Sequence, residues 1–185
     1  MKSNFNFPRI NGEKVYLASL RTDEEAVRLY TKWINDEEIL MYIQHNYRTC
    51  SFEEEIEWAK KAALDKKVHT FSIIEKSSDK LIGTCSIKPS ANNIDFSLGI
   101  MIGDKDFREK GYGTEVIALL IKYCFEELRA HRVSLSLNVE NERAHKCYLK
   151  NGFKDCGVFH ENIFFNGHYA DSIYMEILEK DYFKN

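Results

Sequence analysis

A glycine-interrupted stretch at residues 107–115, Phe-Arg-Glu-Lys-Gly-Tyr-Gly-Thr-Glu, constrains the fold of this chain more than any other segment. Residues 94–102 before it alternate in polarity with the period of a β-strand. Apolar residues after it, from 116 to 128, recur at the three- and four-residue intervals of a helix. Because Gly111 and Gly113 lack a Cβ, the backbone between strand and helix can take unusual φ angles and approach a ligand closely. We therefore expect the amides of residues 109–114 to point outward at a helix N-terminus, an arrangement that binds phosphate oxygens.

Three glycine patterns are candidates for this loop. A P-loop does not fit, because Gly111 and Gly113 are too close together and no Lys-Ser or Lys-Thr pair follows. A dinucleotide fingerprint, G-x-G-x-x-G, has Val116 in place of its third glycine, and this side chain would hold the helix away from the strand. The pattern [QR]-x-x-G-x-[GA] is met in full by Arg108, Gly111 and Gly113. Short glycine patterns also occur in ordinary strand-to-helix turns, so a second motif is needed to decide.

A second motif follows at residues 141–153, which read N-x-x-A-x-x-x-Y-x-x-x-G-F. Asn141 can cap a helix, and Ala144 and Tyr148 lie three and seven residues later, on the same face as the cap. Gly152 is in the position where a helix usually ends with a left-handed residue. By itself Tyr148 is better explained as a half-buried aromatic residue, but in combination with the glycine loop it indicates a shared site.

The two motifs, in this order, resemble those of the GNAT N-acetyltransferases. The segments 12–17, 33–36 and 164–172 also resemble the ribosomal-protein alanine and spermidine acetyltransferases of that family. The resemblance covers nearly the whole chain and is strongest from 94 to 153. It implies one α+β domain over residues 1–185, with an ordered core at about 12–180. The implied architecture is three-layered (α/β/α), with a mixed, mostly antiparallel central sheet and a splayed acyl-CoA cleft.

The resemblance further implies an acetyl-CoA-dependent N-acetyltransferase, which transfers an acetyl group to a primary amine by direct attack on the thioester. The acceptor would be a peptide N-terminal amine or a small-molecule amine such as a polyamine or an aminosugar. The implied cofactor-binding residues are Ile100, Met101, Ile102, Arg108, Glu109, Lys110, Gly111, Tyr112, Gly113, Thr114 and Asn141. The implied catalytic residues are Tyr148 and Asn141. Arg108 either adds charge to a pyrophosphate site or only pairs with a surface carboxylate.

Each part of the implied reaction has a physical requirement. The pantetheine arm contains amides, which can pair with an open strand edge at residues 100–102. An amide near Met101 would stabilise the charge that develops on the thioester oxygen. Tyr148 would supply a proton to the departing thiolate. Because a thiol has a pKa near ~8.5 and a phenol near ~10, this transfer is mildly uphill in water, and the hydroxyl then acts mainly as a hydrogen-bond donor.

The sequence offers several candidates for the general base that deprotonates the amine. The strand expected at 134–138 carries Ser136 and Asn138 where some relatives have a glutamate. Asp95, Glu37 and Glu38 are possible replacements, and each is also explained as a solvated carboxylate. Ten carboxylates against three arginines and lysines lie between residues 22 and 57, which would attract a cationic amine. Acidic first turns of helices produce the same pattern, so both explanations stand.

Composition excludes several other classes. A net charge of −3 argues against a general electrostatic nucleic-acid binder. Five cysteines without a C-x-x-C pair and six histidines without H-x-x-x-H spacing give no metal prediction and indicate a reducing compartment. No apolar run approaches ~18 residues, so we expect no membrane association and a cytoplasmic location. The resembled subgroup also makes a homodimer possible.

Two other functions compete with the transferase. A catalytically idle acyl-CoA-binding module would keep the 108–113 loop but would not need Tyr148. A nucleotide-binding protein would use the loop for ATP or NAD. For the local structure, the sequence predicts capping boxes starting at Thr22 and Ser51 and a closing hairpin, of strands 153–165 and 172–179, about Asn166-Gly167.

Overall fold

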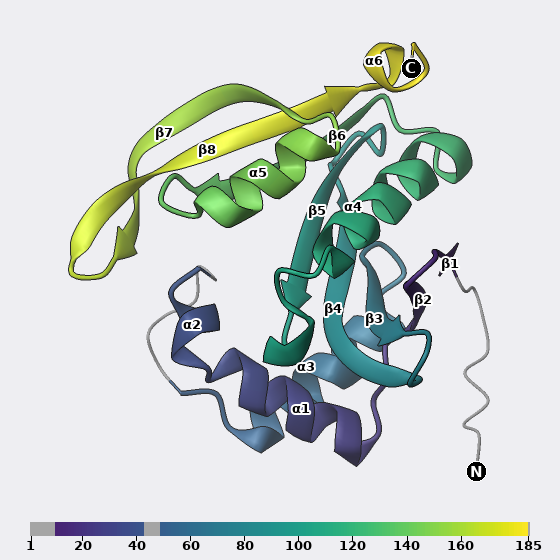
Figure 1. The fold of residues 1–185 in the computed structure, drawn as a ribbon, viewed down its shortest axis with the longest axis vertical. Coiled ribbons are helices and arrows are strands. Elements are labelled where there is room, and N and C mark those ends of the chain that lie inside the picture. Colours follow the sequence, from purple (N-terminus) through teal and green to yellow (C-terminus); the bar gives the residue numbers. More distant parts are fainter. Residues whose placement is uncertain (1–9, 43–48, 185) are drawn as a thin grey trace.

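The protein is described by a computed structural model that covers residues 10–42 and 49–184. Its centre is one open eight-stranded sheet in the order β1-β2-β3-β4-β5-β6-β8-β7 in the described part of the chain (Figure 1). The strands are β1 (Ile10–Asn11), β2 (Val15–Ser19), β3 (His69–Glu75), β4 (Lys80–Pro89), β5 (Asp95–Ile102), β6 (Arg132–Asn138), β7 (Lys154–Phe165) and β8 (His168–Leu178). Neighbouring strands run antiparallel except β5 and β6, which run parallel. The predicted mixed, mostly antiparallel sheet is confirmed.

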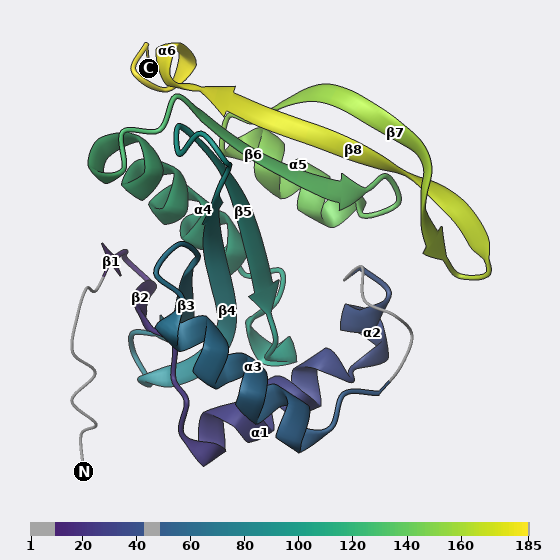
Figure 2. The same ribbon diagram turned by 180° about the vertical axis from the view of Figure 1, so that it is seen from behind.

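Helices cover both faces of this sheet. One face carries α4 (Tyr112–Lys122), with its π-helical continuation Tyr123–Glu127, and α5 (Glu142–Lys150) (Figure 1). The opposite face carries α1 (Glu24–Ile34) and α3 (Phe52–Leu64); in Figure 2, α3 lies in front of the lower ends of β3 and β4, and α1 lies below it. The short elements are α2 (Glu37–Leu40), a 3-10 turn (Lys105–Phe107) and α6 (Glu179–Tyr182). None of the helices in the described ranges combines the length and hydropathy needed to cross a membrane.

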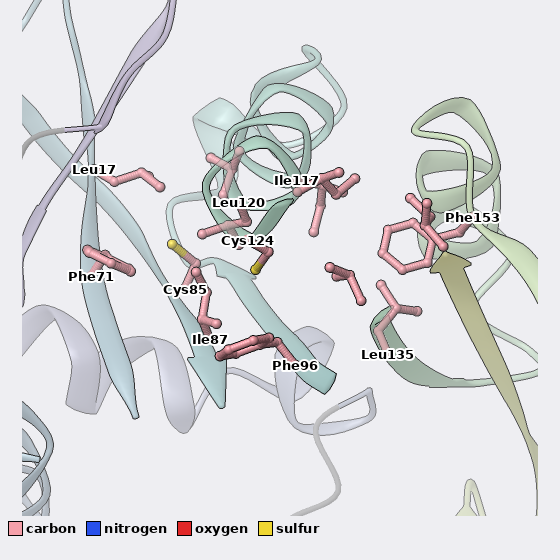
Figure 3. Packing of buried hydrophobic residues seen from close by; sticks show 14 of the residues in the cluster. Leu17, Phe71, Cys85, Ile87, Phe96, Ile117, Leu120, Cys124, Leu135 and Phe153 are labelled. Carbon is pink, nitrogen blue, oxygen red and sulfur yellow. The ribbon is translucent and has the colours of Figure 1, made fainter. Parts of the chain in front are cut away.

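The two faces have separate hydrophobic cores. Beneath α4, Ile117, Leu120 and Cys124 pack against side chains from the strands, including Leu17 and Ile87 (Figure 3). On the other face a second buried cluster joins α1 and α3 to β2 and β4; its members include Tyr16, Val27, Tyr30, Trp33, Ala59 and Leu81. This arrangement gives the three predicted layers and places β5 between two separately packed helical layers.

The sheet opens between β5 and β6. Their parallel pairing is limited to Asp95, Phe96 and Ser97 opposite Arg132, Val133 and Ser134. Beyond this point β5 stays paired with β4 as far as Ile102, opposite Gly83. The edge of β5 that faces β6 therefore has no strand partner in the described chain over residues 98–102.

Several local predictions are confirmed. Ser51 and Glu54 form the reciprocal capping box that starts α3. Asn166 and Gly167, both with positive φ, form the turn between β7 and β8. Gly152 follows α5 with φ of 87°.

Two local predictions are wrong. The first helix is capped by Asp23 and not by Thr22, because the Asp23 carboxylate accepts from the amide of Ala26 and from the guanidinium of Arg21. The closing strand starts at His168 and not at residue 172. Pairing with β7 extends to the turn itself, although these residues do not alternate in polarity.

Candidate active site

The glycine loop ends in a helix start whose backbone donors are open. Glu109 and Gly111 both have left-handed φ, of 61° and 85°. Gly111 is the N-cap of α4 and provides no side-chain cap. The amides of Tyr112, Gly113 and Thr114 in the first turn consequently have no acceptor inside the helix. Together with the positive end of the helix dipole, they form an anion-binding surface of the expected kind.

A cavity of about 550 Å³, here called the loop cavity, lies between this helix start and the splayed strands. Its walls come from α2, β5, the glycine loop, the first turn of α4, β6 and α5. The predicted site residues that line it are Ile100, Met101, Ile102, Arg108, Glu109, Gly111, Gly113, Thr114, Asn141 and Tyr148. The structure thus brings residues from three separate sequence segments to one hollow.

Two predicted site residues do not line the loop cavity. The ring of Tyr112 packs edge-on against Phe107, with 5.3 Å between ring centroids. The Lys110 carbonyl accepts a hydrogen bond of 3.1 Å from Nζ of Lys14. Neither side chain reaches the hollow, so any contribution of these residues to it comes from the main chain.

Tyr148 projects from α5 into the loop cavity. Its ring packs beside Phe153, with 5.9 Å between centroids. Burial, assisted by the neighbouring Cys147, raises the pKa of Tyr148 to about 12. The phenol therefore stays protonated at neutral pH. No hydrogen bond joins its hydroxyl to another residue within the described ranges, so this donor is available to a ligand.

Asn141 and Thr114 position the two helices that border the cavity. The Oδ1 atom of Asn141 accepts from the backbone amide of Ala144 at 3.1 Å, which confirms the predicted cap. This bond does not use the side-chain nitrogen of Asn141, which is a hydrogen-bond donor. The Thr114 hydroxyl lies 3.5 Å from Sγ of Cys147. This contact joins the start of α4 to α5, the helix that carries Tyr148.

The Arg108 side chain acts within the fold. Its Nε donates to the carbonyl of Ile102 at 3.0 Å, and its Nη2 donates to the carbonyl of Gly103 at 2.7 Å. Nη1 donates to the Glu38 carboxylate at 2.8 Å. The guanidinium, whose side chain is 10% exposed, therefore joins the end of β5 to α2. Of the two roles that the sequence allowed, the structure shows the pairing with a carboxylate.

The general-base candidates from the sequence are not gathered in this cavity. Asp95 forms an ion pair with Arg132 at 3.0 Å and lies outside the cavity, as does Glu37. Glu38 lines the cavity but pairs with Arg108. Ser136 also lines it, whereas Asn138 is buried, with its Nδ2 lacking a partner in the described structure. In the described ranges no group of three or more His, Cys, Asp or Glu residues is placed to hold a metal ion.

A second hollow of about 800 Å³, here called the α3 cavity, lies on the opposite face of the sheet. It is lined by α1, α3, β3, β4 and β5, and it shares Gly99, Ile100 and Met101 with the loop cavity. The sequence indicates this hollow only through the acidic stretch at residues 22–57, which includes Glu54 and Glu55. Glu55 lines it and is only 8% exposed. The pKa of Glu55 is raised by burial and, to a lesser extent, by Glu54.

The loop cavity suits the diphosphate, amide-containing arm and thioester of acetyl-CoA. It combines open helix amides, an unpaired strand edge and a protonated phenol. A family model described as an acetyltransferase (GNAT) domain matches residues 14–154. The chain therefore belongs to the GNAT acetyltransferase family, and the resemblance noted in its sequence is confirmed.

Individual relatives support the same class. The chain is 28% identical over 180 residues to a probable N-acetyltransferase, YjcK, of Bacillus subtilis, covering 93% of this chain and 98% of that protein. It is 30% identical over 135 residues to a spermidine N(1)-acetyltransferase of Vibrio cholerae, covering 71% of this chain and 76% of that protein.

A solved structure agrees with these relatives. The crystal structure of Vibrio cholerae spermidine N-acetyltransferase in complex with CoA and spermine superposes with a TM-score of 0.82 and 25% identity, covering 93% of this chain and 99% of that one. The protein is accordingly an N-acetyltransferase with acetyl-CoA as its co-substrate.

Proposed function

We propose that this N-acetyltransferase acetylates the primary amine of a cationic acceptor, and that Tyr148 is its proton donor. The observation that carries the proposal is that open helix amides, an unpaired strand edge and the Tyr148 hydroxyl line a single cavity. The similarity to spermidine acetyltransferases supports a polyamine as the acceptor class. A peptide N-terminus is the second candidate, because the excess of carboxylates between residues 22 and 57 would attract any cationic amine.

Each residue has a defined task in this proposal. Acetyl-CoA, when bound, supplies an activated acetyl group to the amine. The amides of residues 112–114 hold the diphosphate, and the free edge of β5 at residues 100–102 pairs with the amides of the arm. The Tyr148 hydroxyl donates a proton to the sulfur that leaves, and the proton that the acylated nitrogen loses passes through solvent to the phenolate and restores the phenol. The Asn141 cap fixes the start of α5 and thereby the position of Tyr148.

Thiol release from acetyl-CoA tests the activity. The acceptor panel contains spermidine, an aminosugar and a peptide with a free N-terminus, and we expect turnover with spermidine. Turnover with none of the amines would contradict the proposal. In parallel, CoA should raise the melting temperature more than ATP or NAD, because the ligand that binds more tightly stabilises the folded protein more. A ligand at ~100 times its dissociation constant stabilises a protein by roughly 2.7 kcal/mol.

Replacing Tyr148 by Phe tests the proton donor. Loss of a general acid lowers turnover by about 10²-fold or more, so we expect that fall in kcat with CoA affinity preserved. The matched control is Tyr182→Phe, which removes a hydroxyl bonded to Glu126 at 2.9 Å, outside the loop cavity. Unchanged turnover in Tyr148→Phe would assign the proton to another group. An idle module would show CoA binding without turnover in either form.

A cytoplasmic location and a homodimer remain predictions. Gel filtration of the purified chain measures the second directly. A monomer at micromolar concentration would exclude the homodimer.

A further inference from the structure

In the described part of the chain, the α3 cavity contains one acidic side chain without a hydrogen-bond or ion-pair partner. Of the three carboxylates that line the cavity, Glu54 accepts from the amide of Ser51, and Asp65 accepts from the amides of Lys67 and Val68. Glu55 has no hydrogen bond or ion pair to any residue that the structure describes. Because burying a carboxylate without a partner is unfavourable, Glu55 is suited to receive a cation from outside the chain.

The rest of the lining suits a cation attached to an aliphatic chain. The rings of Tyr30 and Trp58 meet edge to face, 5.8 Å apart, and the Trp58 side chain stays 40% exposed beside the hollow. An aromatic face beside a carboxylate is a favourable environment for an ammonium group. Apolar side chains complete the wall: Ile34, Ala62, Val68, Ile100 and Met101. Among the described residues that line the cavity, Lys61 is the single basic one, so the carboxylates outnumber it by three to one.

The position of the cavity relates it to the reaction. It meets the loop cavity at Gly99, Ile100 and Met101. These residues belong to the segment of β5 that has lost its pairing with β6. One end of an amine in the α3 cavity would thus reach the β5 segment that also borders the loop cavity. Its other end would reach the wall that α3 forms, which carries Glu55.

Building on the function proposed above, we infer that the α3 cavity is the acceptor site and that Glu55 binds the second, non-reacting ammonium group of an aliphatic diamine or polyamine. The reacting nitrogen lies at the β5 segment shared by both cavities. The methylenes between the two nitrogens lie along the apolar wall. Glu55 is a specificity-determining residue in this arrangement and takes no part in the chemical step.

A pair of acceptors that differ by one nitrogen tests this inference. The probes are 1,4-diaminobutane and butylamine, compared by kcat/KM for acetyl transfer at saturating acetyl-CoA. We expect the wild type to prefer the diamine by at least about tenfold. Glu55→Gln should abolish that preference by raising KM for the diamine, with little change for butylamine and with CoA affinity unchanged.

The matched control is Glu57→Gln. It makes the same change of charge on the same helix, at an exposed position that does not line the cavity. The control should retain the preference for the diamine. An equal fall in both variants would show a general effect of charge and overturn the inference. A diamine preference that persists in Glu55→Gln would also overturn it.

A second variant keeps the test independent of how Glu55→Gln folds. Ala62→Leu fills part of the α3 cavity without a change of charge. It should raise KM for both amines by roughly tenfold and leave CoA affinity unchanged. Unaltered amine KM values would show that acceptors do not use this cavity. Acetylation of a peptide alone, with neither amine a substrate, would contradict the inference but leave the transferase function intact; no transfer to any amine would contradict the function itself.

Discussion

The loop cavity and the α3 cavity differ in the groups that line them. The first presents main-chain amides and a strand edge, and its two motifs lie within residues 107–153 of the sequence. The second presents side chains gathered from Tyr30 on α1 to Met101 on β5. A main-chain site leaves a local spacing of glycines and caps in the sequence. A side-chain site becomes visible only when distant elements pack together.

The largest effect on CoA binding is expected when a negative charge is placed in the loop cavity, at the start of α4. Gly113→Glu puts a carboxylate where the diphosphate is expected, and like charges in contact cost several kcal/mol. We expect CoA affinity to fall on the order of 100-fold. The same substitution replaces glycine in a first helical turn by an acidic residue, which should raise stability by about 0.5–1 kcal/mol. Calorimetric CoA titration and thermal melting measure the two effects.

The matched control for that variant is Gly113→Ala. A Cβ at this position would lie 3.8 Å from Ile102 Cγ1 and 4.0 Å from Ile100 Cδ1, which are ordinary contacts. The control should keep CoA binding and gain similar stability. If Gly113→Glu binds CoA as well as the control does, the diphosphate does not lie at this helix start.

Arg108→Ala tests whether the basic residue of the loop pattern stabilises the fold or binds the ligand. It leaves the carbonyls of Ile102 and Gly103 without their donor, so we expect a loss of about 1–3 kcal/mol in the free energy of unfolding. For a chain of this size that corresponds to a melting temperature roughly 2–10 °C lower. The effect on CoA affinity should stay under about tenfold.

The control for Arg108 is Arg28→Ala, which breaks an exposed pair with Glu24 and should change stability by about 0.5 kcal/mol or less. If Arg108→Ala instead kept its melting temperature and lost much of its CoA affinity, the guanidinium would have to leave Glu38 and bind the diphosphate.

Two buried carboxylates, Glu75 and Glu55, sharpen the comparison further, because only Glu75 has hydrogen-bond partners among the residues that the structure describes. Glu75, 5% exposed, accepts from the hydroxyls and amides of Ser77 and Ser78. The Ser78 hydroxyl is the main cause that lowers the pKa of Glu75 to about 2, whereas burial raises the pKa of Glu55. At pH 7 we expect Glu75→Gln to lose about 1–2 kcal/mol and Glu55→Gln to gain less than about 1 kcal/mol.

The pH dependence of these two variants has opposite signs. The Glu75 contribution is complete above the ordinary glutamate pKa of 4.5 and is lost as the pH falls toward about 2. The wild type and Glu75→Gln should therefore converge in acid. The Glu55 penalty appears as the pH rises past the same ordinary value, so Glu55→Gln should be the more stable form only above it. Urea unfolding across this pH range measures both; parallel curves would contradict the assignment.

The sequence predicted the parts of the molecule that depend on local chemistry. The Ser51 capping box, the Asn141 cap and the Asn166-Gly167 turn are each decided by a few neighbouring residues, and all three are confirmed. The glycine loop between strand and helix was predictable for the same reason. The prediction of Thr22 as the cap is wrong because Asp23, one residue later, caps the helix and also accepts a hydrogen bond from Arg21.

The parts that escaped prediction depend on tertiary packing. Glu55 is the third of three consecutive acidic residues in a helix start, and nothing local distinguishes it from its exposed neighbour Glu53. Its burial results from the way α3 lies on the sheet. The contacts of Arg108 with Glu38 likewise join positions far apart in the chain. Asp95 is a base candidate in the sequence, but its ion pair with Arg132 depends on the pairing of β5 with β6.

The short parallel ladder between β5 and β6 has a consequence for protein dynamics. Past Ser97 the β5 amides that point away from β4 have no strand acceptor in the described chain, so in the free protein they should exchange with solvent deuterium far faster than the amides that face β4. A coenzyme arm laid along that edge would slow the same few amides. Deuterium exchange of these amides, measured by mass spectrometry, would therefore report whether the coenzyme is bound without any need for turnover.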